Sequence, residues 1–520
     1  MHANCDSKGG YRDPLNVVAE LIHKGVVFWV SDGALRYRAP KGSLSPAELQ
    51  SVHNASSLIA SMLEPDPRSA TDIRRIRESR LWRAPLSFTQ LAHWQFRMQS
   101  GGRPLREVAS ASQIEGRLLT DVLAEVVDDA VCRHDTLCTR IVARGDVPLQ
   151  EIIGTDPPAL EIINLEASKD CNRGAEIRHH FERAVVDARD YAADPLARAV
   201  LLKFSGREHV LILAMDHIVS DGCSLALLLN EIWTAYAQRV NGHRIDLPKI
   251  GMQFAEYALR QRAQSRSILE TARYRNSYFN ASRLPVDLAP TSNGGHGGWG
   301  CRHFWIDQYT LAELRKWVRT NRTTLVMAVF TAYVAAVLRW ANIQEAVVQF
   351  MIDGRMSAEI DHTIGYFAFP IFVNVTLGGG DRFVDLVKSL TGEYCKALDA
   401  ADFGLSQSES PRPQYTRSAS FNWLPSSYHV GSNQLGHVEH AVRHSRLDVA
   451  VPIPDTVDGD ADYDPAMVIS ERDDGLLCEV RFPRCRFSSS GIDRLARQMT
   501  RSLAAMINAP ESRVAGLQTE

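Results

Sequence analysis

The clearest pattern of apolar and polar residues lies near the middle of the chain, where the pattern of a strand is followed closely by that of a helix. Val210 to Met215 is a continuous apolar run of the length expected for a strand buried on both faces. From Leu225 to Trp233 apolar residues recur with helical spacing, and Ser224 stands before them as a candidate N-cap. The pattern predicts a buried strand, a loop over residues 216–222 and a core helix.

The second half of the chain repeats this alternation. Leu325 to Trp340 has the composition of a buried helix, Val347 to Met351 that of a strand, and Phe487 to Ile507 that of a closing helix. Between the halves, residues 285–298 hold the largest concentration of glycine and proline in the chain. The chain is therefore expected to be an α/β protein with mixed sheets and two main units.

The first 64 residues have a separate pattern of helix, hairpin and helix. Strand signals at 26–30 and 34–38 flank a Ser-Asp-Gly turn, with helices predicted over Leu15–His23 and from Ser45 toward Leu63. Such a hairpin leaves one strand edge open for an extended peptide. Residues 24–41 include four basic residues and one acidic residue, which predicts an acidic partner. The residues expected to bind it are Lys24, Val27, Leu35, Arg36, Tyr37, Arg38 and Lys41. The alternative is a small extension packed on the main domain.

Composition and charge narrow the class of protein. A chain of 520 residues with a formal net charge of −3 and no basic stripe does not suit a general nucleic-acid binder. No apolar stretch is long enough for a membrane span or a secretory signal. Nine scattered cysteines indicate reduced thiols and a cytoplasmic protein. His437, His440 and His444 could share a helix face, but without a completing acid or cysteine we expect no metal site.

The loop at 216–222 holds the chain's best candidate for chemistry. Its sequence is Asp-His-Ile-Val-Ser-Asp-Gly, so His217 and Asp221 lie four residues apart between a core strand and a core helix. A neutral imidazole, with a pKa near 6.5, is suited to accept a proton at neutral pH. Gly222 would allow a backbone to approach closely or would simply adopt a positive φ. The alternative for His217 is a core histidine bonded to backbone.

The octapeptide Leu35 to Gly42, followed by Leu44-Ser45-Pro46, resembles the TubC-like β-hairpin docking domains at the N-termini of modular synthetases. The resemblance covers about residues 14–64. It implies that this module receives the acidic C-terminal tail of an upstream carrier-protein subunit. Residues 65–84, with six arginines between Arg68 and Arg83, then form a charged linker.

From Pro85 onward the chain resembles the condensation domains of nonribosomal peptide synthetases. The loop fits HHxxxDG, with Asp216 in place of the first histidine, and Ser87 to Trp94 fits SxAQxRLW at Ser87, Gln90 and Trp94. Further landmarks follow in the family's order: Arg133 to Arg140 (RHExLRT), Asp194 to Arg198 (GPLxR), Asp353-Gly354-Arg355 and Ile364-Gly365-Tyr366-Phe367. The resemblance implies two chloramphenicol-acetyltransferase-like lobes in a V, over 85–275 and 300–510, joined by a linker over 276–299.

The resemblance also implies roles for individual residues. His217 would be the base or would orient the acceptor, and the Gly222 N–H could face the oxyanion. Asp221 would pair with Arg355 and hold the loop. Asp216, the departure from the motif, and Ser220 would support the loop, with Asp216 facing backbone or a basic side chain. Candidates for the acceptor channel are Ser420, Asn422 and His362.

The function implied is acyl transfer from the phosphopantetheine thioester of a carrier protein to a small soluble acceptor. We favour an alcohol acceptor, ester formation and chain release in a polyketide or hybrid pathway, by a free-standing monomer without a permanently bound cofactor. The alternatives are amide formation, a catalytically silent module that recruits carriers, and an acyltransferase that uses acyl-CoA. The sequence identifies neither the acyl chain nor the acceptor.

Overall fold

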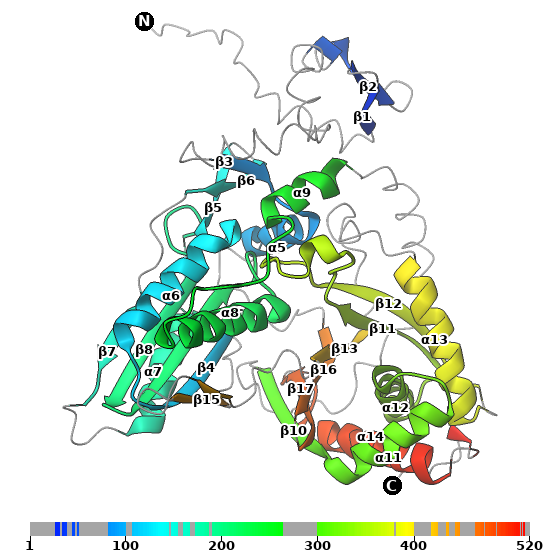
Figure 1. The fold of residues 1–520 in the computed structure, drawn as a ribbon. Helices are drawn as coiled ribbons and strands as arrows, with labels where there is room; N and C mark the ends of the chain where they lie inside the picture. Colours follow the sequence, from blue (N-terminus) through cyan, green and yellow to red (C-terminus); the bar gives the residue numbers. More distant parts are fainter. Residues whose placement is uncertain are drawn as a thin grey trace, which may run out of the picture.

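The computed structural model describes residues 27–31, 34–38, 44–46, 49–50, 82–99, 107–144, 147–153, 160–166, 172–186, 190–263, 299–378, 381–399, 418–424, 433–435, 442–447, 463–472, 474–484, 486–509, 511 and 513–514. In this part of the chain a two-stranded hairpin precedes two lobes, each built on a six-stranded sheet. The lobes diverge from the region around helices α5 (Phe88–Gln99) and α9 (Phe254–Ala263) (Figure 1). This is the α/β fold with mixed sheets that the sequence predicts.

The sheet of the first lobe carries helices on both faces. Its strand order is β14-β15-β4-β9-β8-β7, and every neighbouring pair is antiparallel except β7 and β8. Buried side chains of α6 and α8 pack on one face and those of α7 on the other. The elements are β3 (Trp82–Pro85), β4 (Glu107–Gly116), α6 (Thr120–Arg133), η1 (Asp135–Cys138), β5 (Thr139–Arg144), β6 (Val147–Ile152), β7 (Glu161–Asn164), α7 (Arg173–Val186), β8 (Ala197–Ser205), β9 (Glu208–Asp216) and α8 (Gly222–Val240).

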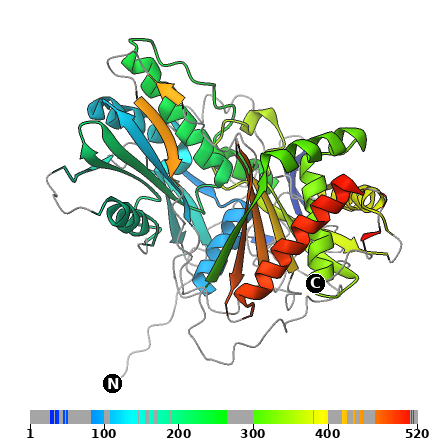
Figure 2. The same ribbon diagram turned by 90° about the horizontal axis from the view of Figure 1, so that it is seen from below.

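The sheet of the second lobe has the described helices on one face only (Figure 2). Its strand order is β10-β17-β16-β13-β11-β12, and the core lies between this sheet and helices α11 to α14. The elements are β10 (Trp299–Asp307), α11 (Gln308–Thr320), α12 (Leu325–Trp340), β11 (Glu345–Ile352), η2 (Ala358–Ile360), β12 (Phe369–Thr376), α13 (Phe383–Asp399), β13 (Ser418–Leu424), β16 (Tyr463–Arg472), β17 (Gly475–Pro483) and α14 (Ser489–Asn508).

Two strands from the second half of the chain join the first lobe. β15 (Val442–Leu447) pairs with β4 in antiparallel register, and β14 (Asn433–Leu435) pairs with β15. They cover an edge of β4 that would otherwise present unpaired backbone groups. The range expected for the second lobe, 300–510, therefore includes a segment that crosses to the first.

Most predicted elements form where the sequence places them. α12 has the predicted bounds, β11 includes the predicted strand, and the hairpin is formed by β1 (Val27–Ser31) and β2 (Ala34–Arg38). The helices predicted beside the hairpin lie largely outside the described residues.

Two local predictions are wrong. The cap of α8 is Asp221 rather than Ser224, because the Asp221 carboxylate, three residues before Ser224, accepts the Ser224 N–H at 2.8 Å. His444 lies in strand β15, so it cannot share a helix face with His437 and His440, which lie outside the described residues.

No single helix among the described residues is long and apolar enough to cross a membrane. The pair α11 and α12 meets the length and composition criteria only together, with a bend of 106° between them. Nearly all of α12 is buried in the core of the second lobe.

Candidate active site

The loop between β9 and α8 exposes one side chain from an otherwise buried stretch. From His209 to Asp221 every residue is buried except His217, which is half-buried. The turn is closed by the Val219 N–H on the Asp216 carbonyl at 3.1 Å and by the Ser220 hydroxyl on the same carbonyl at 3.0 Å. The local fold therefore leaves the His217 imidazole partly exposed and buries the residues on either side of it.

The hydrogen bonds of His217 assign its tautomer. Its Nδ1 lies 2.8 Å from the Ser220 carbonyl oxygen, which can only accept, so Nδ1 carries the proton and Nε2 keeps a free lone pair. Burial lowers the pKa of His217, and the nearby His93 lowers it further, while Asp221 opposes them. The ring is therefore neutral at neutral pH and can accept a proton at Nε2.

Asp221 ties the loop to the second lobe. Its carboxylate receives both guanidinium nitrogens of Arg355, at 3.1 and 3.2 Å, and the backbone N–H groups of Phe367 and Ala368, at 3.0 and 3.2 Å. The side chains of Asp221 and Arg355 are 1% and 4% exposed. Burial by itself would raise the pKa of Asp221, but Arg355 outweighs it and holds that pKa below its ordinary value. This bidentate pair joins β9–α8 to the loop after β11.

Gly354 lets that loop deliver the arginine. It has a φ of +69°, and a Cβ at this position would lie 2.2 Å from the Phe367 carbonyl oxygen. The Arg355 guanidinium then lies 4.5 Å from the centre of the Phe367 ring and donates to the Ser224 hydroxyl at 2.9 Å. A glycine is required here both for its conformation and for the close approach of two backbones.

Asp216 faces backbone and a basic side chain, in line with the sequence-based expectation. It accepts the Ile218 N–H and the Tyr191 hydroxyl, each at 2.9 Å, and its carboxylate lies 3.6 Å from Nε2 of His93. Sequence reasoning missed His93 and Tyr191. The available signal was the histidine at the position where the motif SxAQxRLW has leucine.

Gly222 begins α8 and is exposed. Its φ is not positive, and an added Cβ would meet only Leu424 Cδ2 at 3.8 Å, an ordinary contact. The alternative that Gly222 serves a positive φ is therefore wrong. Its N–H lies at the positive end of the α8 dipole, one residue after the loop that presents His217.

The acceptor candidates on β13 lie on the helix-free face of the second sheet. Ala419 and Phe421 point into the core with the helices, so Ser420 and Asn422 point the other way, as does Leu424. Because Leu424 reaches Gly222, this face adjoins the loop between β9 and α8. His362 is half-buried in the turn after η2, beside Thr363, whose carbonyl accepts from Arg355.

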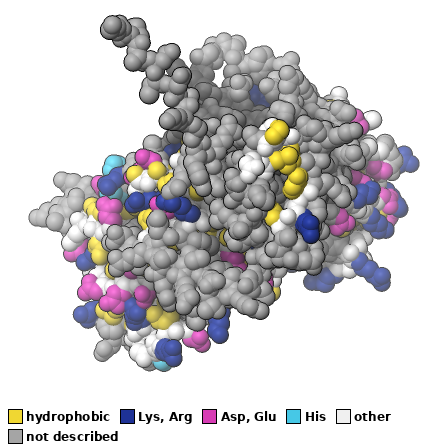
Figure 3. All heavy atoms as spheres, turned by 90° about the horizontal axis from the view of Figure 1, so that it is seen from above, with side chains coloured by type: hydrophobic (Ala, Val, Ile, Leu, Met, Phe, Trp, Pro, Cys, Tyr) yellow, Lys and Arg dark blue, Asp and Glu magenta, His cyan; other side chains and the backbone are white. Residues whose placement is uncertain are grey.

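The hairpin is described in part. Val27 pairs with Arg38 and Trp29 with Arg36 in antiparallel register, and Arg36 and Tyr37 are exposed while Leu35 is half-buried. Lys24 and Lys41 lie outside the described residues. In the view of Figure 3, basic and acidic side chains of the described residues are interspersed rather than gathered by sign.

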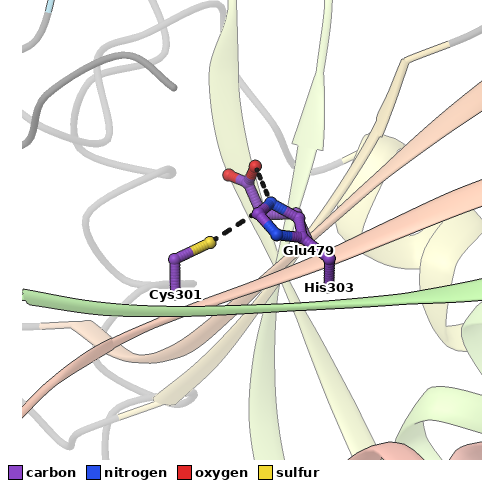
Figure 4. A group of neighbouring side chains, drawn as sticks. All are labelled: Cys301, His303 and Glu479. Carbon is purple, nitrogen blue, oxygen red and sulfur yellow. Dashed lines mark hydrogen bonds and ion pairs between the residues drawn. The ribbon is translucent and has the colours of Figure 1, made fainter. Parts of the chain in front are cut away.

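One group among the described residues brings metal-ligand atoms together. Cys301 and His303 on β10 face Glu479 on β17, with Sγ to Nε2 at 3.4 Å and Nε2 to the carboxylate at 3.0 Å (Figure 4). The second Glu479 oxygen is bound by Arg481. The Arg481 charge opposes a cation there, and the ion pairs account for the arrangement.

Comparison with known proteins gives two family matches. The family described as "Condensation domain" matches residues 82–519, and the "TubC N-terminal docking domain" matches residues 16–59. A dimodular nonribosomal peptide synthase of Bacillus subtilis is 27% identical over 340 residues, which is 63% of this chain and 14% of that protein. The first four curated relatives are matched over only 6% to 39% of their own length.

Solved structures show the same fold. The X-domain in its complex with OxyB from teicoplanin biosynthesis matches 84% of this chain and 96% of its own, with a TM-score of 0.67 and 20% identity. The SgcC5 protein from Streptomyces globisporus, in complex with a naphthyl ethanediol and sucrose, matches 82% of this chain and 100% of its own, with a TM-score of 0.64 and 20% identity.

Proposed function

Because the chain belongs to the condensation-domain family, we propose that it transfers an acyl chain from the phosphopantetheine thioester of a carrier protein to a small acceptor, with His217 as base. The observation that carries this proposal is the presentation of His217. It is the accessible side chain of a buried loop, and its Nδ1–H is fixed on a carbonyl so that Nε2 is free to accept.

The transfer needs no group beyond the two substrates and this chain. The acceptor O–H or N–H attacks the thioester carbonyl while its proton passes to His217 Nε2, which gives a tetrahedral oxyanion. The N–H of Gly222, at the start of α8, is our candidate to stabilise that charge. Collapse breaks the C–S bond, and the leaving thiolate takes the proton from His217, which returns the imidazole to its neutral form.

We favour an alcohol acceptor and an ester product. An alcohol is almost wholly protonated at neutral pH, so it needs a neutral base during attack, and the lowered pKa of His217 keeps the imidazole in that form. Ser420 and Asn422 offer short polar side chains on the face that adjoins Gly222 through Leu424. The similar SgcC5 protein binds a small aryl diol in its solved structure, which supports an acceptor of that size.

The N-terminal match supports a docked carrier as donor. Residues 16–59 match a docking domain, and the exposed Arg36 and Tyr37 lie on the β2 strand of the hairpin. We propose that the hairpin binds the acidic C-terminal tail of the upstream carrier protein along an open strand edge. A diffusible acyl-CoA would need no such receptor.

A recruitment module is the second candidate. It is favoured by Asp216, which departs from the family motif, and by the fold shared with an X-domain that forms a complex with OxyB. The intact pair of Asp221 and Arg355 and the accessible His217 favour catalysis.

Intact-mass measurement separates these functions. The protein is mixed with an acyl-carrier protein or with acyl-CoA, in the presence of an alcohol or an amine, and the loss of the acyl group from the carrier is followed. We expect ester formation from the carrier substrate, a loss of about 10²–10⁴-fold in His217→Ala, and no loss in the exposed-histidine control His179→Ala. Equal rates with acyl-CoA would reject carrier dependence, and no turnover with either acceptor would favour recruitment.

A charge reversal tests the hairpin. Arg36→Glu should weaken transfer at low carrier concentration and leave the rate at saturation unchanged, because only carrier binding is altered. Arg315→Glu, an exposed arginine on α11, is the control. Equal behaviour of the two variants would contradict the docking proposal.

A further inference from the structure

A second imidazole lies beside the candidate base and comes from a distant part of the chain. The His93 ring, on α5, is 6.1 Å from the His217 ring between centroids. The Tyr366 ring contacts both, at 4.4 Å from His217 and 5.8 Å from His93. α5 is held against the Tyr366 segment by the Thr89 hydroxyl, which donates to the Tyr366 carbonyl at 2.7 Å. His93 therefore belongs to the same site as His217.

His93 also completes the partners of a buried carboxylate. Its Nε2 lies 3.6 Å from Asp216 Oδ1 and 3.3 Å from the Tyr191 hydroxyl, and that hydroxyl donates to Asp216 Oδ1 at 2.9 Å. The side chains of His93 and Asp216 are 9% and 4% exposed. Burial by itself would raise the pKa of Asp216, but the hydrogen bond and charge of His93 outweigh it and lower that pKa. The carboxylate is therefore charged, and the His93 ring lies directly against it.

One further charge lies close to this pair. The Arg97 guanidinium, also on α5 and buried, lies 4.0 Å from the centre of the Tyr191 ring, and Tyr191 in turn donates to Asp216. From β9 and its loop, the groups that face His93 are Asp216 and His217; from the second lobe it is Tyr366. His93 thus lies against both the loop carboxylate and the ring of the base.

We propose that His93 is a positioning residue for the transfer, which forms with Asp216 a buried pair that holds the turn of His217. The proposal rests on the proposed function in so far as His217 is the base. Both positions depart from the family motifs: His93 stands where SxAQxRLW has leucine, and Asp216 stands where HHxxxDG has its first histidine. Each change alone would leave one of the two side chains without the other, and together they form the buried pair.

The pair has a consequence for proton transfer. His93 lowers the pKa of His217 in addition to burial, so His217 holds the proton of the acceptor less tightly and returns it more readily to the leaving thiolate. The paired Asp216 meanwhile accepts the Ile218 N–H, which fixes the backbone directly after His217.

Exchanging the two residues back tests the proposal. We would measure carrier-dependent transfer in His93→Leu, Asp216→His and the double variant H93L/D216H. Each single variant should lose about 10-fold to 100-fold in kcat, while the double variant should recover to within a few-fold of the native rate, because both partners change together. Losses that simply multiply in the double variant would overturn the proposal.

A titration of His217 gives a readout that does not require turnover. In protein labelled with ¹⁵N-histidine, His217 should titrate at higher pH in His93→Leu and in His93→Gln, because both remove the imidazole that lowers the pKa of His217. Glutamine keeps a hydrogen-bond donor for Asp216. A shift in the pKa of His217 in His93→Leu but not in His93→Gln would therefore indicate a packing effect and would overturn the proposal. No shift in either variant would overturn it as well. Absence of transfer in the native protein would refute the proposed function while this titration still decides the role of His93.

Discussion

Asp221→Asn isolates the ion pair that joins the catalytic loop to the second lobe. Asparagine caps a helix about as well as aspartate, so the start of α8 is little affected. What changes is the partner of Arg355, whose guanidinium is 4% exposed and would keep its charge without a buried counter-charge. Removing one member of a buried pair costs about 3–5 kcal/mol, and we expect a loss of folding free energy in that range.

Denaturant unfolding of four proteins measures this loss: the native chain, Asp221→Asn, Arg355→Met and the double variant. The double variant should be about 2 kcal/mol less destabilised than the sum of the single variants, because it leaves no unpaired charge. Lys316→Met, which breaks the exposed pair with Glu313 on α11, serves as control and should cost about 0–1 kcal/mol. Strict additivity in the double variant would refute the reasoning.

The same pair predicts a pH dependence of stability. The pKa of Asp221 is lower in the folded protein than in the unfolded chain, because Arg355 outweighs the effect of burial. Its contribution is therefore present above the unfolded pKa of about 3.9 and is lost as the pH falls through the folded value. The stability difference between the native protein and Asp221→Asn should be constant from pH 7 to pH 5 and should shrink below about pH 4.

Three further predictions concern the site. The pKa of His217 is lowered, chiefly by burial and then by His93. In a pH–rate profile, kcat/KM should therefore fall only below the ordinary histidine pKa of about 6.5. A decrease in kcat/KM that begins above pH 7 as the pH is lowered would contradict this. Gly222→Pro removes the N–H at the first position of α8, where proline is tolerated, and should lower kcat/KM about tenfold or more if that N–H faces the oxyanion. Gly222→Ala, whose Cβ has room and which keeps the N–H, is the control, and equal activities of the two variants would exclude that role. Treatment with EDTA and the substitution Cys301→Ser should both leave the rate unchanged, because the described metal-ligand atoms that converge lie on β10 and β17 and the Arg481 charge on Glu479 opposes a cation there. A loss of activity restored by zinc would contradict this.

The strand, loop and helix around His217 could be predicted because short segments encode them. The apolar run before Asp216 and the helical period after Ser224 are local patterns, and both elements form as expected. The capping side chain was not predictable in the same way. Asp221 and Ser224 are both good caps, and the choice depends on Arg355 and on two backbone N–H groups from the second lobe.

What the sequence could not reveal depends on contacts between distant segments. The pairing of β15 with β4 places a segment of the second half in the first lobe, and no periodicity in either strand encodes that choice. His93 likewise lies in a helix whose local pattern gives no reason for a histidine. Only the combination of two departures, at positions 93 and 216, points to a shared site, and their contact is visible only in the fold.

The two carboxylates that flank the base explain why His217 stays neutral. A free carboxylate this close would favour the imidazolium and raise the pKa of the base. Each carboxylate instead faces a basic side chain from a different element: Asp221 pairs with Arg355 of the second lobe, and Asp216 lies against His93 of α5. Burial and then His93 therefore outweigh Asp221, and the pKa of His217 is lowered. The loop thus keeps two acidic residues beside its base without pairing either with it, and Nε2 remains free for a substrate proton.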